Sequence, residues 1–288
     1  MSQQRIGVLL VHGLGGTQYD LGSLHKTLKK AGVDTHSITL PGHGRQPQDL
    51  LGVMMEDWLE AVEKQYLELA PQYDVLHIVG MCLGALIAIE VAKRVRHDKG
   101  RLIALAPPVF LDGWATPWYR GVRHVLYRLP MLAGRMKVTE EEPFGIKSDL
   151  VRAIVKAKFE RGDNFHYPWV PLSCVEQVDR LRAAVQQDLD RIQCPTLIVH
   201  AAEDELTSPR SAHFLAERIG HDRTRVVIVQ NSYHMICVDN DRDQVAMEVL
   251  RHLRLDISVI KVRERKTAAR IDQRLRSANE KRAANQLV

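Results

Sequence analysis

The sequence lacks any hydrophobic run long enough for a membrane span, and it has only four cysteines. A transmembrane helix needs about 20 consecutive apolar residues, and no segment of the chain approaches that length. The first apolar segment, residues 6–11, follows a short polar start without the features of a signal peptide. The cysteines show neither a CxxC pair nor the spacing of metal ligands. We therefore expect a cytoplasmic protein with reduced cysteines, no metal, no cofactor and no transmembrane segment.

The excess of positive charge is confined to the C-terminal end of the chain. The full sequence carries a net charge of +5. Residues 261–288 contain nine Lys or Arg against three Asp or Glu, so the rest of the chain is close to neutral. We expect no nucleic-acid partner. The segment 255–288 is predicted to be either a basic, solvated or frayed helix, or a docking element for an acidic partner or an anionic surface.

Short apolar segments alternate with helical patterns through most of the chain. This alternation is typical of a parallel sheet with helices on both faces, so we predict an α/β fold with a mostly parallel, doubly wound sheet. The predicted core comprises residues 1–106 and 191–254. The expected strands are 6–11, 34–39, 74–79, 102–106, 196–200 and 225–230, and the expected helices are 18–31, 56–69, 83–98, 209–219 and 240–253.

Residues 107–190 interrupt the alternation and contain ten of the sixteen aromatic residues. The segment also has helical patterns and several prolines, so we predict a helical insertion after a strand end. Ligands of such sheets bind at the carboxyl ends of the strands. An insertion there would cover the site as an aromatic cap, or lid. The alternative is a helical subdomain whose aromatic residues form a small core of their own.

Residues 80–84, G-M-C-L-G, have the pattern of a nucleophile elbow, with Cys82 in the position of the nucleophile. Such an elbow is a sharp turn from a strand into a helix, and small flanking residues relieve crowding of the backbone there. The preceding residues 75–79 are mostly apolar and β-rich, and residues 83–96 have helical character. This context predicts a catalytic cysteine. The alternative is a buried cysteine that packs as a small hydrophobe.

A cysteine nucleophile needs a base, and the base needs an acid to orient it. In enzymes with such an elbow the acid and then the histidine follow the nucleophile along the chain. His234 alone among thirteen histidines comes directly after the last predicted strand. Three adjacent carboxylates, Glu203, Asp204 and Glu205, follow the preceding strand, and any of them could be the acid.

Acyl transfer also needs two backbone N–H groups for the oxyanion. One should come from Leu83, directly after the nucleophile. The other should come from the loop after the first strand, H-G-L-G-G-T at 12–17, where glycines allow the backbone to approach a ligand, and we assign it to Leu14. The alternative for this loop is phosphate binding, but neither G-x-G-x-x-G nor G-K-[ST] is present.

Together these motifs resemble the α/β-hydrolase superfamily, in particular its bacterial carboxylesterase and monoacylglycerol-lipase-like branch. The resemblance covers residues 6 to about 253 and implies that Asp204 is the acid, that Leu14 and Leu83 are the oxyanion donors, and that a cap lies at 107–190. The cysteine departs from the branch, although dienelactone hydrolases and polyhydroxyalkanoate synthases in the superfamily have cysteine elbows. The shared segments are V-H-G-L-G-G-T at 11–17, P-G-H-G at 41–44, the elbow at 80–84, A-A-E-D-E at 201–205 and S-Y-H at 232–234.

The cysteine favours a thioester over an alkyl ester as the substrate. A thiol has a pKa of about 8.5, far below that of an alkyl alcohol, so the enzyme sulfur would leave an alkyl-ester intermediate more easily than the alkoxide. With a thioester the two leaving groups are matched. We therefore predict acyl transfer or hydrolysis through an acyl-Cys82 intermediate, on a thioester or activated ester with a hydrophobic acyl group carried on coenzyme A or acyl carrier protein.

Two other functions stay open. The first is a carboxylesterase or lipase-like ester hydrolase that uses cysteine in place of serine. The second is a non-catalytic binding protein on a hydrolase fold, against which the presence of both Asp204 and His234 argues. An acidic carrier protein would also complement the basic tail.

Overall fold

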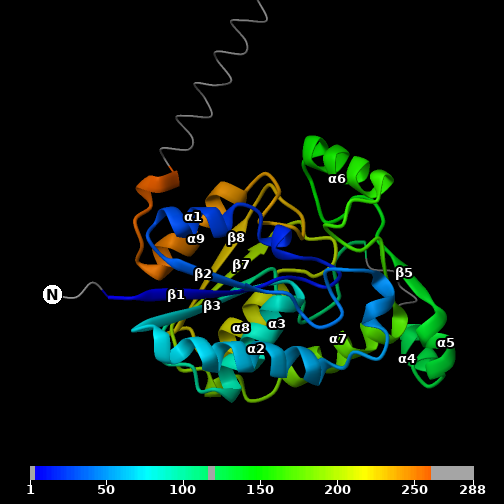
Figure 1. Ribbon diagram of the computed structural model, residues 1–288, viewed down its shortest axis with the longest axis horizontal. Helices are drawn as coiled ribbons and strands as arrows, with labels where there is room; N and C mark the ends of the chain where they lie inside the picture. Colours follow the sequence, from blue (N-terminus) through cyan, green and yellow to red (C-terminus); the bar gives the residue numbers. More distant parts are fainter. Residues whose placement is uncertain (1–3, 116–120, 261–288) are drawn as a thin grey trace, which may run out of the picture.

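The computed structural model describes residues 4–115 and 121–260 (Figure 1). Within these residues six strands form one sheet in the order β2-β1-β3-β4-β7-β8, and every neighbouring pair is parallel. The predicted parallel sheet is therefore confirmed, and the strand boundaries differ from the predicted ones by at most two residues. The strands are β1 (Ile6–Val11), β2 (Asp34–Ile38), β3 (Val75–Met81), β4 (Leu102–Leu105), β7 (Thr196–Ala201) and β8 (Thr224–Val229).

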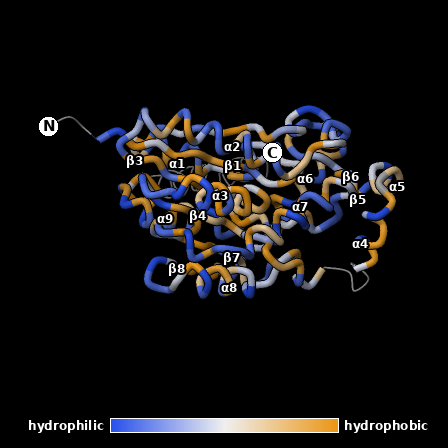
Figure 2. The backbone as a smooth tube through the Cα atoms, turned by 90° about the horizontal axis from the view of Figure 1, so that it is seen from below, coloured by the Kyte–Doolittle hydropathy of each residue, from blue (hydrophilic) through white to orange (hydrophobic). Residues whose placement is uncertain are grey.

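Helices cover both faces of this sheet (Figure 1). Side chains of β1 alternate between the two resulting cores, with Leu9 and Val11 in one and Val8 and Leu10 in the other. Burial on both faces explains why the central strands β1, β3, β4 and β7 are mostly apolar, and in Figure 2 hydrophobic residues gather around α3 in the middle of the molecule. One face carries α2 (Met55–Leu69), α3 (Leu83–Arg94), α7 (Leu172–Val185) and α8 (Arg210–Ile219), and the other carries α1 (Leu24–Lys30) and α9 (Arg242–Leu253).

The order of the strands reverses at β1, which lies between β2 and β3. In a sheet of this kind the loops on either side of such a reversal leave a crevice at the carboxyl ends of the strands. All six strands are parallel, so the loops that follow β1, β3, β7 and β8 emerge at the same edge. These are the loops to which the sequence assigns the candidate site residues.

Two predicted helices are shorter than expected. The helix predicted at 18–31 is split into a 3₁₀ turn, η1 (Gln18–Leu21), and α1. Gly22 separates them with φ of 55°, and any side chain at this position would overlap the carbonyl oxygen of Cys237. The helix predicted at 83–98 ends at Arg94, and Arg96 has a positive φ of 49°. Tertiary contact and backbone conformation override helical propensity at both places.

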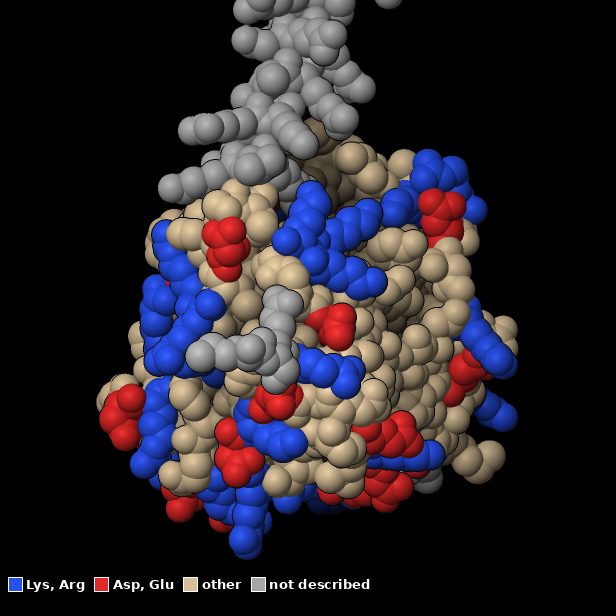
Figure 3. Space-filling view, turned by 60° about the vertical axis from the view of Figure 1, so that its left-hand side comes forward, with Lys and Arg blue, Asp and Glu red and all other residues tan. Residues whose placement is uncertain are grey.

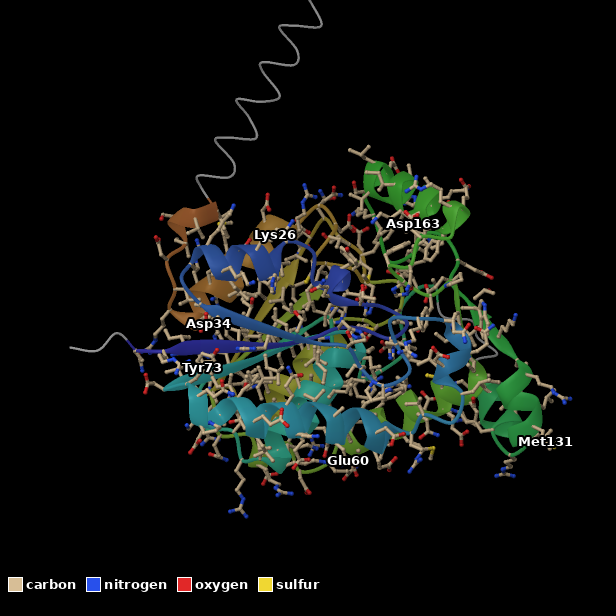
Figure 4. The ribbon with its side chains drawn as sticks, viewed as in Figure 1. Lys26, Asp34, Glu60, Tyr73, Met131 and Asp163 are labelled. Carbon is tan, nitrogen blue, oxygen red and sulfur yellow. The ribbon has the colours of Figure 1, made fainter. Side chains whose placement is uncertain are left out.

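The sequence predicts a helical insertion at 107–190. The structure differs from this prediction, because the segment also contains a pair of antiparallel strands. Its last helix, α7, packs as a layer of the core through Val178, Leu181 and Val185. Figure 4 places Met131 and Asp163 far apart at the outer ends of the remainder. The other elements are α4 (Arg123–Leu126), α5 (Pro130–Arg135), β5 (Lys137–Thr139), α6 (Asp149–Arg161) and β6 (Trp169–Pro171).

The first residues of the predicted tail pack against the body. Ile260 is only 3% exposed, and Ile257 and Val259 contact the core on the α1 and α9 face. The strongly basic part, 261–288, lies outside the described residues, as do Trp118 and Tyr119. Lys and Arg are interspersed with Asp and Glu over the face in Figure 3, in keeping with a nearly neutral body. No helix in the described ranges is long and apolar enough to cross a membrane.

Gly84 gives a direct test of the packing that supports the site. A Cβ at this position would overlap the carbonyl oxygen of Val11, a backbone atom of β1 that cannot rotate away. We predict that Gly84→Ala lowers the free energy of unfolding by about 1–3 kcal/mol in urea denaturation. The control is Gly134→Ala on α5, where the nearest atom to a new Cβ is 3.7 Å away. This control should be neutral or slightly stabilising, and equal losses in the two variants would contradict the packing argument.

Candidate active site

Cys82 occupies the turn between β3, which ends at Met81, and α3, which begins at Leu83. Its φ of 55° and ψ of −120° fall in a region that residues with a side chain rarely adopt. A Cβ on Gly80 would overlap the carbonyl oxygen of Gly84, so strand and helix meet here backbone to backbone. The turn lifts the half-buried Cys82 side chain into a cavity at the carboxyl edge of the sheet. This is the geometry that the elbow motif predicts.

His234 and Asp204 meet at the same edge of the sheet. The Nδ1 of His234, in the loop after β8, donates to Oδ2 of Asp204, which follows β7, over 2.8 Å. The other carboxylate oxygen of Asp204 accepts from the backbone N–H groups of Leu206 (2.9 Å) and Thr207 (3.0 Å). Asp204 is thus held on both oxygens and fixes the orientation of the imidazole. The Nε2 of His234 is buried and has no hydrogen-bond partner within the described residues.

The ionisation of this pair follows from its surroundings. Burial lowers the pKa of His234, but its electrostatic interactions with Asp204 and Cys82 outweigh this, and the net pKa lies well above 6.5. Burial raises the pKa of Asp204, but the charge and hydrogen bond of His234 outweigh this and lower it. The ionised pair therefore contributes stability that is lost as pH falls through the lowered pKa of Asp204, or rises through the raised pKa of His234.

The three adjacent carboxylates take different positions. Glu203 is exposed at the surface and forms an ion pair with Lys147 over 2.8 Å. Glu205 lines the cavity, and its Oε2 accepts from the backbone N–H of His234 over 3.0 Å. Burial raises the pKa of Glu205, with a further contribution from the charge of Asp204, although the His234 charge opposes this. Of the three, Asp204 is the one that contacts the His234 imidazole.

The loop after β1 places Leu14 in the lining of the cavity. Three of its neighbours donate their N–H groups within the protein: Gly13 to Oδ2 of Asp20 (3.0 Å), Gly15 to Nε2 of His43 (3.0 Å) and Gly16 to the carbonyl of Gly13 (3.3 Å). Leu14 lines the same cavity as Cys82, and its N–H makes no such bond within the described residues. This N–H is therefore available to a ligand.

Leu83 supplies the second backbone N–H of the candidate oxyanion site. It is the first residue of α3, where a backbone N–H has no acceptor within the helix. Leu83 also lines the cavity beside Cys82. The positive end of the helix dipole adds to the attraction for an anion at this point. The structure thus brings together all five residues that the sequence assigns to the site.

Two buried histidines, to which the sequence assigns no role, lie in the H-G-L-G-G-T and P-G-H-G motifs. Nε2 of His12 accepts from the backbone N–H of Leu40 over 3.1 Å, and Nε2 of His43 accepts from Gly15. Burial lowers the pKa of both residues, that of His43 to about 4, so both rings are neutral and can accept. The histidine of the H-G-L-G-G-T motif and that of the P-G-H-G motif hold the loop that carries Leu14.

The cavity that contains Cys82 and His234 has a volume of about 1380 Å³. Its lining from residues 107–190 is mainly aliphatic, with Phe144, Phe159 and Phe165 as the aromatic members. Three of the described aromatic residues of this segment thus line the cavity, and most of the lining that the segment contributes is aliphatic. Tyr167 instead packs in the core, and Phe110 packs against Phe214. The aliphatic members from this segment include Leu111, Val122, Leu126, Val138, Ile146, Val151, Ile154, Val155, Val170, Leu172, Val175 and Val178.

The parallel sheet, the strained elbow and the histidine–aspartate pair at its carboxyl edge define an enzyme of the α/β-hydrolase superfamily. The chain belongs to the family described as "Serine aminopeptidase, S33", whose model matches residues 2–241.

The chain is also similar to named ester hydrolases. A thermostable monoacylglycerol lipase from Bacillus sp. (strain H-257) is 27% identical over 243 residues, which cover 83% of this chain and 87% of the lipase. A carboxylesterase from Bacillus subtilis (strain 168) is 25% identical over 247 residues, which cover 85% and 91%. The crystal structure of a monoacylglycerol lipase from Paleococcus ferrophilus has the same fold, with a TM-score of 0.70 and 21% identity over 88% of this chain and 94% of that one.

The four cysteines are free thiols in very different surroundings. Burial raises the pKa of Cys174 to about 12 and that of Cys194 to about 11. Burial, with a smaller contribution from the charge of Asp20, raises the pKa of Cys237 to about 12. Cys82 is the least buried of the four and lies beside His234. No cluster of His, Cys, Asp and Glu within the described ranges could hold a metal ion.

These differences predict selective alkylation. Because a thiolate is the reactive form of cysteine, iodoacetamide at pH 7 should modify Cys82 in the native protein and leave the three buried thiols intact. Peptide mapping by mass spectrometry gives the site, and Cys82→Ala should remain unmodified. Modification of a buried cysteine at a comparable rate would contradict this assignment.

Proposed function

We propose that this protein hydrolyses carboxylic esters of hydrophobic acids through an acyl-Cys82 intermediate. The observation that carries the proposal is the arrangement in the lining of a large apolar cavity. There the His234 imidazole, whose orientation Asp204 fixes, lies beside Cys82 at the strained elbow. The backbone N–H groups of Leu14 and Leu83, which are available to a ligand, belong to the same lining. The names of the related monoacylglycerol lipase and carboxylesterase support an ester as the substrate.

Each group has one role in the proposed double displacement. The Cys82 sulfur attacks the ester carbonyl as its proton passes to Nε2 of His234. The N–H groups of Leu14 and Leu83 bind the oxyanion of the tetrahedral intermediate. His234 then returns the proton to the leaving alkoxide, so that an alcohol departs and acyl-Cys82 remains. A water molecule, deprotonated by His234, attacks the acyl carbon, and the carboxylic acid leaves as the thiol is restored. Asp204 keeps the imidazole in the required tautomer throughout.

A hydrophobic acyl chain is the group that fits this cavity. The volume of about 1380 Å³ exceeds that of a typical small-ligand pocket. Burying methylene groups against the aliphatic lining stabilises the complex by about 0.8 kcal/mol for each CH₂. Longer acyl chains should therefore bind more tightly than acetyl esters.

A thioester is a second candidate substrate, and the cysteine itself favours it. The Cys82 thiolate and the thiolate of a thioester are leaving groups of similar pKa. Acylation by a thioester therefore does not reverse as readily as acylation by an alkyl ester. The acyl group would be carried on coenzyme A or on acyl carrier protein. An acidic carrier of this kind would also complement the basic residues of 261–288. Such carriers are consistent with the cytoplasmic location that the sequence predicts.

The proposal is tested by intact-protein mass spectrometry after mixing the enzyme with activated oxygen esters and with acyl thioesters of equal chain length. We expect a mass increase equal to one acyl group, followed by its loss in water, and no adduct in Cys82→Ala. Comparable turnover of unactivated esters and thioesters would favour the ester hydrolase. A strong preference for thioesters would favour the second candidate. Unaltered turnover in Cys82→Ala would overturn both.

Asp204 and its neighbour Glu203 give a matched test of the triad. We predict that Asp204→Asn lowers kcat by about 10³- to 10⁴-fold, because the neutral amide cannot hold the imidazole in the tautomer required of the base. Glu203→Gln removes a carboxylate one residue away that is paired with Lys147 at the surface, and it should change kcat by less than about twofold. Steady-state kinetics with a p-nitrophenyl ester would measure both. Equal effects would contradict the role of Asp204.

A further inference from the structure

The loop that presents Leu14 is held by the cap as well as by the core. The backbone N–H of Tyr167 donates to the carbonyl of Gly15 over 2.7 Å, and the hydroxyl of Thr17 donates to the carbonyl of Phe165 over 3.0 Å. The ring of Tyr167 also stacks on His43, with centroids 6.0 Å apart and planes inclined by 10°. Residues 164–167, between α6 and β6, therefore form a cap segment seated directly on this loop.

Asp20 holds the loop from the opposite direction. Asp20 is 4% exposed, and its Oδ2 accepts from the N–H of Gly13. The same carboxylate lies so close to Gly16 that any Cβ there would overlap it. The two residues that Asp20 constrains, Gly13 and Gly16, stand on either side of Leu14. The position of the Leu14 N–H therefore depends on the position of the Asp20 carboxylate.

His166, from the cap segment, is the cation that faces this carboxylate. Its Nδ1 lies 3.6 Å from Oδ1 of Asp20, and its Nε2 lies 3.6 Å from Oε1 of Glu140, which follows β5. Burial lowers the pKa of His166, but Asp20 and Glu140 together raise it to about 10. The ring is therefore charged at neutral pH.

Other titratable groups also surround His166 and Asp20. The neutral rings of His12 and His43 face them from the loops after β1 and β2, and the neutral thiol of Cys237 lies near Asp20. Lys158 of α6 is a cation, but its Nζ lies over the ring of Phe165, 4.8 Å from the centroid. The two carboxylates therefore dominate the surroundings of the charged imidazole.

We propose that His166 is a positioning residue of the oxyanion site, which acts through Asp20 to fix the loop that carries the Leu14 N–H. The proposal rests on the proposed function, in which Leu14 is an oxyanion donor. It extends that function by making the oxyanion site complete only when the cap segment 164–167 is seated. His166 does not touch the reacting atoms.

The test compares His166→Gln with the matched control His124→Gln, an exposed cap histidine on α4. The rate constant for acyl-enzyme formation with p-nitrophenyl butyrate should fall by about 10- to 100-fold in His166→Gln, because a misplaced donor stabilises the oxyanion less. KM should stay within about twofold. Alkylation of Cys82 by iodoacetamide forms no oxyanion, so its rate should not change, which also shows that the elbow is folded. The control should behave as the wild type, and equal acylation rates in all three proteins would overturn the proposal.

A double variant tests whether the effect passes through Asp20. Asp20→Asn keeps an acceptor for the Gly13 N–H but removes the charge that His166 faces. If the two residues act as one unit, adding Asp20→Asn to His166→Gln should lower the acylation rate little further. Losses that multiply in the double variant would mean independent roles and would overturn the proposal.

Hydrogen exchange gives a measurement that does not depend on turnover. The amides of residues 13–17 should exchange faster in His166→Gln than in the wild type, while those of α3 remain protected. Unchanged exchange in the loop would overturn the inference even for an active enzyme. A wild type that forms no acyl-enzyme with any ester or thioester would overturn the proposed function instead, and faster exchange in the variant would still support the coupling of cap and loop.

Discussion

The close approach of three backbones at the elbow is the constraint on which the candidate site depends. Neither Gly80 nor Gly84 has room for a Cβ, because the carbonyl oxygens of Gly84 and Val11 occupy that space. As a result α3 lies directly against β1 and β3, and Cys82 must complete the turn at a φ of 55°. Because nearly every residue of α3 is buried, the core fixes this strained turn. The Cys82 sulfur and the Leu83 N–H are therefore set by the same packing.

Two buried aspartates extend this rigidity to the loops, which have no sheet partners for their backbone groups. Asp239 is fully buried and accepts from Lys147 N–H (2.6 Å), from Ser148 N–H (2.9 Å) and from Tyr233 N–H (3.0 Å). It thereby joins the cap segment before α6 to the loop of His234. Asp20 likewise holds the loop after β1 through the N–H of Gly13. It also faces His166 in the cap segment 164–167, which follows α6. Both segments that flank α6 thus contact candidate site loops, and a movement of α6 would displace both loops.

The parts of the site that the sequence predicted are those adjacent to the end of a strand or helix. Cys82, Asp204 and His234 each follow a strand, and their order along the chain restricts the choice among many acids and histidines. Contacts such as that between Thr17 and Phe165, 148 residues apart, have no local signal. The break at Gly22 likewise comes from a distant carbonyl, and strands of three residues such as β5 are too short to show a period. Aromatic composition, finally, does not distinguish side chains that line a cavity from those that pack beneath it.

The protonation of His234 bears on how a cysteine could serve an ester hydrolase. An alkoxide is a poorer leaving group than a thiolate, so productive acylation by an ester requires protonation of the leaving oxygen before the sulfur departs. The raised pKa of His234 favours transfer of the thiol proton to its imidazole, which then holds the proton for the leaving oxygen in a buried position where Asp204 stabilises the imidazolium. In the proposed double displacement His234 takes the proton of the thiol as the sulfur attacks, and it then acts as the acid that protonates the leaving oxygen. The electrostatics of the site thus suit a thiol nucleophile, whose proton His234 holds until the leaving oxygen takes it.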